Sequence, residues 1–268
     1  MESELLAWTI RRKALEMVNH ANASHIGGIL SVADIVAVLY SDVLHICSDD
    51  PKSQYRDRLV MSKGHCGVAV YIALAMNGFI PSEILDTYGE NGSRLSCHIS
   101  HHNVSGVEMT TGSLGHGCCV ACGMALDGKL KKEAHQVYVI VGDGECNEGT
   151  VWEMAMFAAH QGLDNFTVIV DRNGMQAMGD CKDVLDMGAL EAKWRAFGWE
   201  TISVDGHDHA MLKEAFRKSR NGMPRAIIAK TIKGKGVSFM ENDLQWHYRS
   251  PQGEWYPRAV RELGECPI

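Results

Sequence analysis

Two polar segments that follow short apolar runs carry side chains suited to metal and phosphate chemistry. The run 137–141 ends in Gly-Asp-Gly, with Asp143 at its centre, and the run 166–170 ends in Asp-Arg-Asn, with Asn173 last. If both runs are strands joined by the helical stretch between them, a right-handed βαβ unit brings both polar ends to one edge of a sheet. There, a carboxylate and an amide offer oxygen ligands to a hard divalent cation that carries phosphate.

The Gly-Asp-Gly segment also has a simpler interpretation, a tight turn that leads into a helix. In the chemical interpretation, Gly142 and Gly144 let the chain turn closely around phosphate groups, and backbone N–H groups at the start of the next helix bind phosphate oxygens. No Gly-x-Gly-x-x-Gly pattern lies beside the segment, so it differs from a dinucleotide-binding loop.

Length and composition limit the class of protein. The chain has 268 residues, 46% of them hydrophobic, and a formal net charge of −7. This size predicts one large domain over residues 1–268. The chain has no run of basic residues, which argues against nucleic-acid binding, and its charged amino-terminal segment argues against a signal peptide or membrane anchor. Nine cysteines, an odd number, fit a reducing cytoplasm better than a disulfide framework.

Two clusters raise a redox or metal alternative. Cys119 and Cys122 form a Cys-x-x-Cys segment, but no second pair stands at zinc-finger spacing and the surrounding small residues favour a buried helix. The histidines at 98, 101 and 102 pose the same question, and one solvated loop with a single functional histidine is the simpler interpretation.

Apolar spacing predicts the elements that position these groups. Helices are expected over 3–20, 64–78 and 113–127, and over 31–45 with Ser31 as its cap. From residue 137 onward strands alternate with helices, which predicts a doubly wound, mostly parallel α/β sheet flanked by helices. The last thirty or so residues are expected to be extended or irregular. The alternating elements are strand 137–141, helix 150–161, strand 166–170, helix 189–197, strand 199–204, helix 208–220 and strand 225–231.

Six ordered segments closely resemble the amino-terminal, thiamine diphosphate-binding half of transketolase, and the resemblance covers nearly the whole chain. Because 268 residues leave no room for the remaining domains, the chain looks like the short subunit of a split, two-chain transketolase. The six segments are ASHIGG (23–28), RDRLVMSKGHCG (56–67), CHIS (97–100), GVEMTTGSLGHG (106–117), GDGECNEG (142–149) and KGKGVSFMENDLQWH (233–247).

The resemblance implies a thiamine diphosphate and Mg²⁺ site, in which Ca²⁺ or Mn²⁺ could replace Mg²⁺. By this resemblance Asp143, Asn173 and the backbone carbonyl of Met175 are the metal ligands. The implied cofactor-binding residues are His65, Gly112, Ser113, Leu114, Gly142, Asp143, Gly144, Glu148, Asn173 and His247.

Four histidines match catalytic positions of the family, namely His25, His65, His98 and His247. Imidazole titrates near neutral pH, which suits proton transfer to and from sugar hydroxyl and carbonyl groups. The alternative for each is a buried, hydrogen-bonded structural histidine. The histidines at 101, 102, 116 and 160 stay unassigned, although His116 stands where many relatives have Gln.

Four further charged residues allow two interpretations each. Glu148 and Glu153 match glutamates at the dimer interface of the family, or they are first-turn acids favoured by the helix dipole. Lys233 and Lys235 hold phosphate or face solvent.

The resemblance implies transfer of a two-carbon ketol unit from a ketose, or its phosphate, to an aldose, or its phosphate, with pentose phosphates as the default sugars. No residue here matches the glutamate that activates the pyrimidine ring, so a partner chain with the pyrimidine-binding domain is expected, in an α₂β₂ assembly. The alternatives are one chain of another thiamine enzyme, such as a 1-deoxyxylulose-5-phosphate synthase or a 2-oxo acid dehydrogenase, and a non-catalytic cofactor-binding module.

Overall fold

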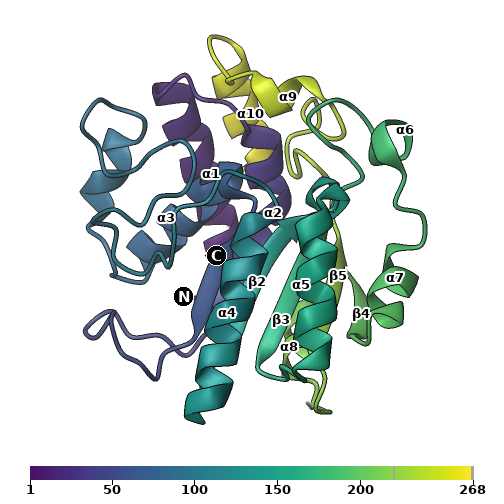
Figure 1. The fold of residues 1–268 in the computed structure, drawn as a ribbon. Helices are drawn as coiled ribbons and strands as arrows, with labels where there is room; N and C mark the ends of the chain where they lie inside the picture. The colour runs from purple at the N-terminus through teal and green to yellow at the C-terminus, as the bar shows by residue number, and fades with distance from the viewer. Residues whose placement is uncertain (220, 267–268) are drawn as a thin grey trace.

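Five parallel strands form the sheet at the centre of the fold (Figure 1), in the order β1-β2-β3-β5-β4. The computed structural model describes residues 1–219 and 221–266. Helices lie on both faces of this parallel sheet, so it is doubly wound, as predicted. The strands are β1 (Arg58–Met61), β2 (Val137–Gly142), β3 (Phe166–Arg172), β4 (Glu200–Asp205) and β5 (Arg225–Lys230).

The register of the central strands places their carboxyl ends side by side. Gly142, the last residue of β2, stands opposite Asp171 of β3. Arg172 at the end of β3 stands opposite Lys230 at the end of β5. The loops that follow these three strands therefore leave the same edge of the sheet.

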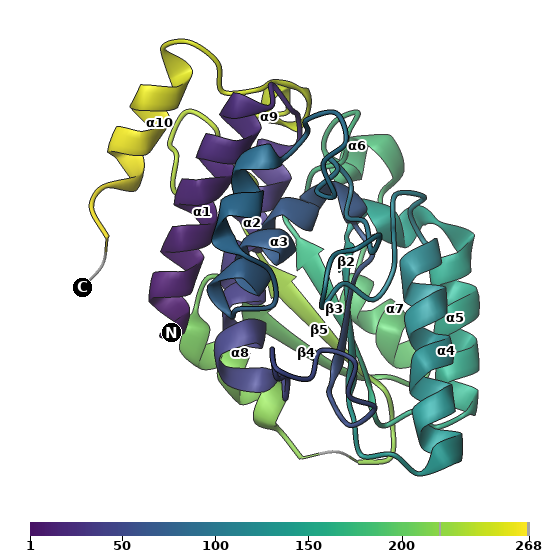
Figure 2. The ribbon, with the colours of Figure 1, turned by 90° about the vertical axis from the view of Figure 1, so that its left-hand side faces the viewer.

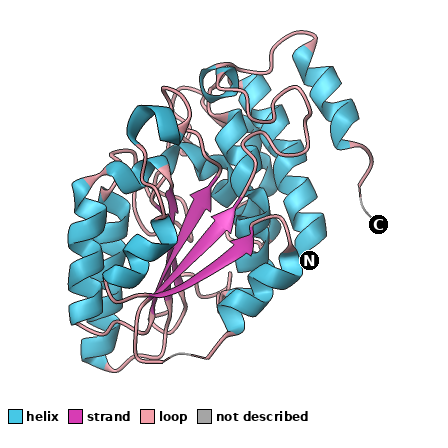
Figure 3. Cartoon of the chain, turned by 90° about the vertical axis from the view of Figure 1, so that its right-hand side faces the viewer, coloured by secondary structure: helices cyan, strands magenta, loops and turns pink. Residues whose placement is uncertain are grey.

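Helices cover both faces of the sheet, as Figure 2 and Figure 3 show from opposite sides. One face packs against α1 (Ser3–His20), α2 (Ile26–Val38), α3 (Gly67–Met76) and α8 (His209–Arg217), with α10 (Trp255–Leu263) outside α1. The other face packs against α4 (His116–Lys131), α5 (Gly149–His160) and α7 (Leu190–Ala196). Two short helices, α6 (Cys181–Leu185) and α9 (Gln245–Tyr248), lie in the loops at the carboxyl edge.

The sequence of strand β2 is apolar because both of its faces are buried. Val139 and Val141 belong to the apolar core with α4 and α5, whereas Tyr138 and Ile140 belong to the core with α2 and α3. Side chains alternate between the two faces of a strand, and both faces are covered here, so no position is left for a polar residue.

Two predictions about the elements are wrong, and one strand has no predicted counterpart. Helix α2 begins at Ile26 and continues as a π-helical turn at 39–43, so Ser31 lies inside a fully buried helix and does not cap one. Strand β1 was not expected. The final residues, predicted to be irregular, form α9 and α10, the latter with Trp255 against the core and the charged residues outward.

The other predicted helices and strands are present with small shifts at their ends. The predicted helix 208–220 is observed as α8, and its last position lies outside the described residues. Residues Ile26–Val43 are long and apolar enough to cross a membrane, but 83% of this segment is buried inside the fold. Packing in the core thus accounts for its apolar composition.

Candidate functional site

A cavity of about 630 Å³ opens at the carboxyl edge of the sheet. Its walls come from the loops after β1, β2, β3 and β5 and from the start of α2. Most residues of the predicted site line it, together with two lysines: His25, Lys63, His65, His98, Gly112, Leu114, Gly142, Gly144, Glu148, Asn173, Met175, Lys233 and His247.

Four imidazole rings from separate parts of the chain meet in this cavity. The ring centroid of His25 lies 5.2 Å from that of His65, 5.4 Å from that of His98 and 5.0 Å from that of His247. The rings of His65 and His247 are 5.6 Å apart. The structure therefore brings together all four histidines that the sequence singled out, with His25 in the middle.

His25 has an unusual backbone conformation. Its φ of 75° lies in the left-handed region, which is uncommon for a residue with a Cβ. Its N–H donates to the carbonyl of His247 at 2.9 Å, and its own carbonyl accepts from Gly28 at 3.1 Å in the first turn of α2. These bonds hold the ring at the entrance to the helix, and strained backbone of this kind concentrates at functional sites.

Burial controls the protonation of the histidines. It lowers the pKa of His25 to about 4 and that of His247 to about 3, and nearby cationic groups act in the same direction. Burial also lowers the pKa of His65 well below its ordinary value. At pH 7 these three rings are neutral, so each presents one N–H donor and one acceptor nitrogen.

Consecutive backbone N–H groups bind the side-chain oxygens of Asp143 and Asn173. The N–H of Gly174 donates to Oδ2 of Asp143 at 2.6 Å, and the N–H of Met175 donates to Oδ1 of Asn173 at 3.1 Å. Gly144 donates to the other carboxylate oxygen of Asp143 at 2.9 Å. Asp143 faces a second hollow of about 400 Å³ that also borders Asn173 and Met175.

This donor set fits a hard divalent cation. It combines carboxylate, amide and backbone carbonyl oxygens, the ligand types that Mg²⁺ and Ca²⁺ prefer. Burial, and to a lesser extent the charge of Asp171, raises the pKa of Asp143, so this carboxylate lacks enough positive charge around it. A cation bound by Asp143 and Asn173 would supply that charge.

A buried ion pair lies beneath the site, and sequence reasoning did not name its lysine. Nζ of Lys63 lies 2.5 Å from Oδ2 of Asp171, and both side chains are almost completely buried. Burial alone would lower the pKa of Lys63, but the charge of Asp171 outweighs it and raises that pKa. Two features of the sequence could have identified Lys63. It is a lysine, and it stands just after an apolar run and close to His65.

Lys233 points into the cavity, which favours the phosphate-binding alternative over the solvent-facing one. Its Nζ lies 3.2 Å from Nδ1 of His247 and 3.5 Å from the carbonyl of Gln176. Burial, followed by the charge of Lys63, lowers the pKa of Lys233. An anion between the two ammonium groups would relieve this repulsion. Lys235 is half-buried and lies outside the cavity lining.

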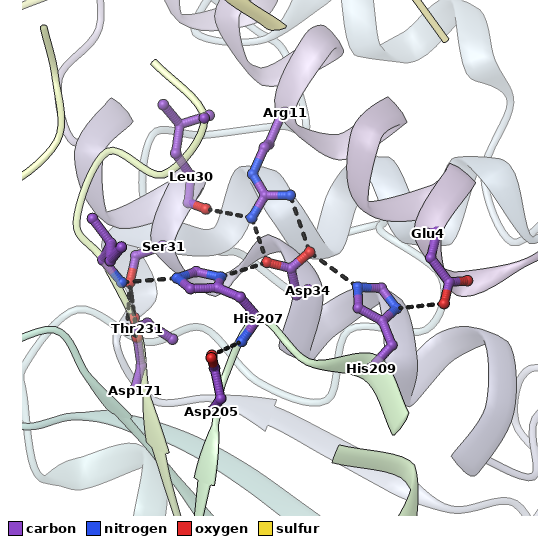
Figure 4. Close-up of polar contacts among 12 residues, drawn as sticks. Glu4, Arg11, Leu30, Ser31, Asp34, Asp171, Asp205, His207, His209 and Thr231 are labelled. Atoms are coloured by element: carbon purple, nitrogen blue, oxygen red, sulfur yellow. Dashed lines mark hydrogen bonds and ion pairs between the residues drawn. The ribbon is translucent and has the colours of Figure 1, made fainter. Parts of the chain in front are cut away.

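A network behind the site fixes the chain that leads to Lys233 (Figure 4). Asp34 of α2 is buried and contacts Arg11, Nδ1 of His207 at 2.6 Å and Nε2 of His209 at 3.0 Å. Nε2 of His207 accepts the N–H of Ile232 at 2.9 Å. Through these contacts α2 is tied to the loops after β4 and β5, on which the cavity depends.

Glu145 is a second residue that sequence reasoning missed. Its buried carboxylate accepts from Oγ of Ser62 at 2.5 Å, from the N–H of Gly115 at 2.9 Å and from the N–H of Gly142 at 3.1 Å. It therefore joins the loops after β1 and β2 to the turn before α4. At that turn Gly115 has a φ of 81°, and an added Cβ would lie 2.8 Å from Cβ of Glu148.

Some predicted residues lie outside the cavity. Ser113 is exposed and is not among the lining residues. Glu153 is exposed on α5, and His116 begins α4 with its Nδ1 3.2 Å from the carbonyl of Leu114. The rings of the histidines at 101 and 102 lie tilted against each other, with their centroids 4.3 Å apart.

The Cys-x-x-Cys segment lies in α4, where Cys122 is buried and Cys119 half-buried, and both thiols are free. Within residues 1–219 and 221–266, no three His, Cys, Asp or Glu side chains gather as a metal centre. These observations favour the buried-helix interpretation of this segment.

Residues 2–261 match the family described as transketolase, thiamine diphosphate binding domain. The chain belongs to the transketolase family. It is 42% identical over 264 residues to one of the subunits of the apulose-4-phosphate transketolase of Phocaeicola vulgatus, covering 98% of this chain and 94% of the relative. It is 41% identical over 256 residues to the 6-deoxy-6-sulfo-D-fructose transketolase subunit SqwG of a Clostridium species, covering 95% and 93%.

Other transketolases match with less than half of their length. The human transketolase is 36% identical over 259 residues, which cover 95% of this chain and 41% of the human one. The solved transketolase of Campylobacter jejuni superposes with a TM-score of 0.92 at 30% identity, covering 100% of this chain and 44% of that chain. The resemblance to the amino-terminal part of transketolase and the predicted fold class are thereby confirmed.

Proposed function

We propose that this chain is the diphosphate-binding subunit of a two-chain, Mg²⁺-dependent transketolase that moves a two-carbon ketol unit from a ketose, or its phosphate, to an aldose, or its phosphate. The observation that carries the proposal is the meeting of four imidazoles, two lysines and Asn173 around one cavity, with Asp143 facing the adjoining hollow that also borders Asn173. Ca²⁺ or Mn²⁺ would be accepted in place of Mg²⁺, because the donor set is all oxygen.

The chain's own residues would hold and orient the reactants. Asp143, Asn173 and the carbonyl of Met175 would hold the metal, and Lys233 would face the diphosphate. When bound, thiamine diphosphate supplies the nucleophilic carbon that cleaves and transfers the ketol unit. The protein contributes position, charge and proton transfer.

The histidines would handle the protons. The neutral rings of His25, His65 and His247 would accept a proton from a sugar hydroxyl and then return that proton to a sugar oxygen, as general acid–base catalysts do. His98 is exposed at the mouth of the cavity, where it would meet the sugar first.

We further propose a partner chain that carries the pyrimidine-binding domain, in an α₂β₂ assembly. Two relatives of this length are named transketolase subunits, and single-chain transketolases are more than twice as long. Val120 of α4 and Met156 and Phe157 of α5 are exposed apolar side chains on two helices that pack against each other, which suits a protein partner. The chain would act in the cytoplasm as a single domain.

The related subunit named for 6-deoxy-6-sulfo-D-fructose, a six-carbon sugar, supports sugars beyond the pentose phosphates. The substrates would therefore be ketoses and aldoses, or their phosphates, as a class. A 1-deoxyxylulose-5-phosphate synthase is the second candidate because it is also a thiamine enzyme. The names of the two related subunits favour transketolase, and a strict requirement for pyruvate as donor would favour the synthase.

Activity of the purified chain, with and without its partner chain, tests the proposal. Ketol transfer in the presence of thiamine diphosphate and Mg²⁺ is expected only from the two chains together. Full activity from this chain alone would contradict the two-chain arrangement. Asp143→Ala should abolish Mg²⁺-dependent binding of thiamine diphosphate, and Asp127→Ala, which changes an exposed aspartate of α4, should leave it intact. Normal cofactor affinity in Asp143→Ala would contradict the metal assignment.

A further inference from the structure

We infer that Ser31 is a positioning residue that fixes the orientation of the Asn173 side-chain amide, so that its oxygen and not its nitrogen faces the metal. The inference rests on the proposed metal site and adds a residue to it. Ser31 lies in the middle of α2, where all thirteen residues are buried, and its hydroxyl reaches the end of β3.

The single hydroxyl hydrogen of Ser31 is committed to Asp171. Oγ of Ser31 lies 2.7 Å and 2.9 Å from the two carboxylate oxygens of Asp171. Asp171 is paired with the ammonium group of Lys63, and a carboxylate in an ion pair only accepts hydrogen bonds. Thr231, shown with Ser31 and Asp171 in Figure 4, also donates to this carboxylate.

Oγ of Thr231 is a poorer partner for the Ser31 hydrogen. It lies 3.1 Å from Oγ of Ser31, farther than either oxygen of Asp171, and it is uncharged. Hydrogen bonds to ionised acceptors are the stronger ones. Ser31 Oγ can therefore only accept a hydrogen bond from its remaining neighbour, because its hydrogen is used at Asp171.

That neighbour is the amide of Asn173, at 3.2 Å from Oγ of Ser31. Only the nitrogen end of the amide can donate to this oxygen, so Oδ1 lies at the opposite end. There it accepts the N–H of Met175 at 3.1 Å. If the amide were reversed, its oxygen would face the lone pairs of Ser31 Oγ, and its NH₂ group would face the N–H of Met175. Neither pair can form a hydrogen bond, so both contacts select the same orientation.

The selected orientation is the one that a metal requires. Oδ1 of Asn173 and Oδ2 of Asp143 accept from the consecutive N–H groups of Met175 and Gly174, and both residues border the hollow of about 400 Å³. With Ser31 removed, one of the two selecting contacts is lost and the amide nitrogen can turn toward the cation. Residues that orient metal ligands typically change metal affinity about 10–100-fold.

Titration with Mn²⁺ tests this role without measuring activity. The full chain, assembled with its partner chain, is mixed with thiamine diphosphate, and free Mn²⁺ is followed by electron paramagnetic resonance. Ser31→Ala is expected to weaken Mn²⁺ binding by about 10–100-fold. The matched control Thr231→Val removes a hydroxyl from the same carboxylate but does not touch Asn173, and it should leave Mn²⁺ binding nearly unchanged.

A double-mutant cycle separates orientation from packing. In an Asn173→Asp background both side-chain ends are oxygens, so Ser31→Ala should no longer weaken Mn²⁺ binding. An equal loss in both backgrounds, or an equal loss in Thr231→Val, would show that Ser31 acts only through packing and would overturn the inference. Unchanged binding in Ser31→Ala would overturn it too. A wild-type protein that bound no Mn²⁺ with the cofactor would instead contradict the proposed metal site itself.

Discussion

The backbone N–H of His25 donates to the carbonyl of His247 at 2.9 Å, and the imidazole rings of these two residues lie 5.0 Å apart. The bond joins the start of α2 to the short helix α9, near opposite ends of the chain. Because it uses only main-chain atoms, either ring can be replaced without breaking it. The pair therefore allows the chemistry of the rings to be tested apart from the fold.

His25→Gln and His247→Gln should each lower kcat/KM for ketol transfer by about 10²–10⁴-fold, the usual contribution of a positioned acid–base group. Glutamine keeps hydrogen-bonding capacity but cannot exchange a proton near neutral pH. The measurement is steady-state kinetics of the assembled enzyme, with His101→Gln as a control on an exposed loop. Activity retained in both variants would show that these rings do not transfer protons.

The stability of the chain should fall as the pH is lowered from about 6.5 toward 4. The pKa of His25 is lowered from 6.5 to about 4, so between these values the unfolded chain binds a proton that the folded chain does not. His65 and His247 shift in the same direction. Denaturant unfolding across this pH range should give a shallower decline for His25→Gln than for the wild type. An NMR titration in which His25 protonates near its ordinary pKa would contradict the expectation.

Glu145→Gln should lower the free energy of unfolding by about 1–3 kcal/mol at pH 7, the cost of leaving buried polar groups unpaired. The carboxylate accepts three hydrogen bonds, whereas an amide of the same size would direct N–H donors at one of those partners. Urea unfolding measures the change. Glu148→Gln, which alters a neighbouring exposed acid, should leave stability unchanged, and an equal loss there would point to a nonspecific effect.

Phe157→Asp should prevent assembly with the partner chain while leaving this chain folded. Phe157 is 45% exposed on α5, next to Met156, which is 54% exposed, and a charge in a buried interface is costly. Size-exclusion chromatography with light scattering reports assembly, and circular dichroism reports folding. Leu130→Asp provides the control at the far end of α4, where the leucine is 74% exposed. Normal assembly of Phe157→Asp would place the partner on another surface.

Local patterns were enough to predict the α/β alternation from residue 137 onward, because β2, β3 and β5 contain continuous apolar runs separated by helical stretches, and β4 alternates apolar with polar residues. The same approach missed β1, whose four residues are too few to show a period. It also misplaced the start of α2. Ser31 looked like a cap because serine is favoured there, and only the buried partner Asp171 explains why it stands inside the helix.

The types and order of the site residues were determined by the sequence alone, because Asp143, Asn173 and the four histidines stand in recognisable local segments. Tertiary structure decided which other residues serve them. The contacts of Lys63 with Asp171, of Glu145 with Ser62 and of Ser31 with Asn173 join residues 83 to 142 positions apart. No local sequence pattern predicts such contacts. They form only after the parallel strands fold with their carboxyl ends at one edge, where the buried charged groups come within hydrogen-bonding distance of each other.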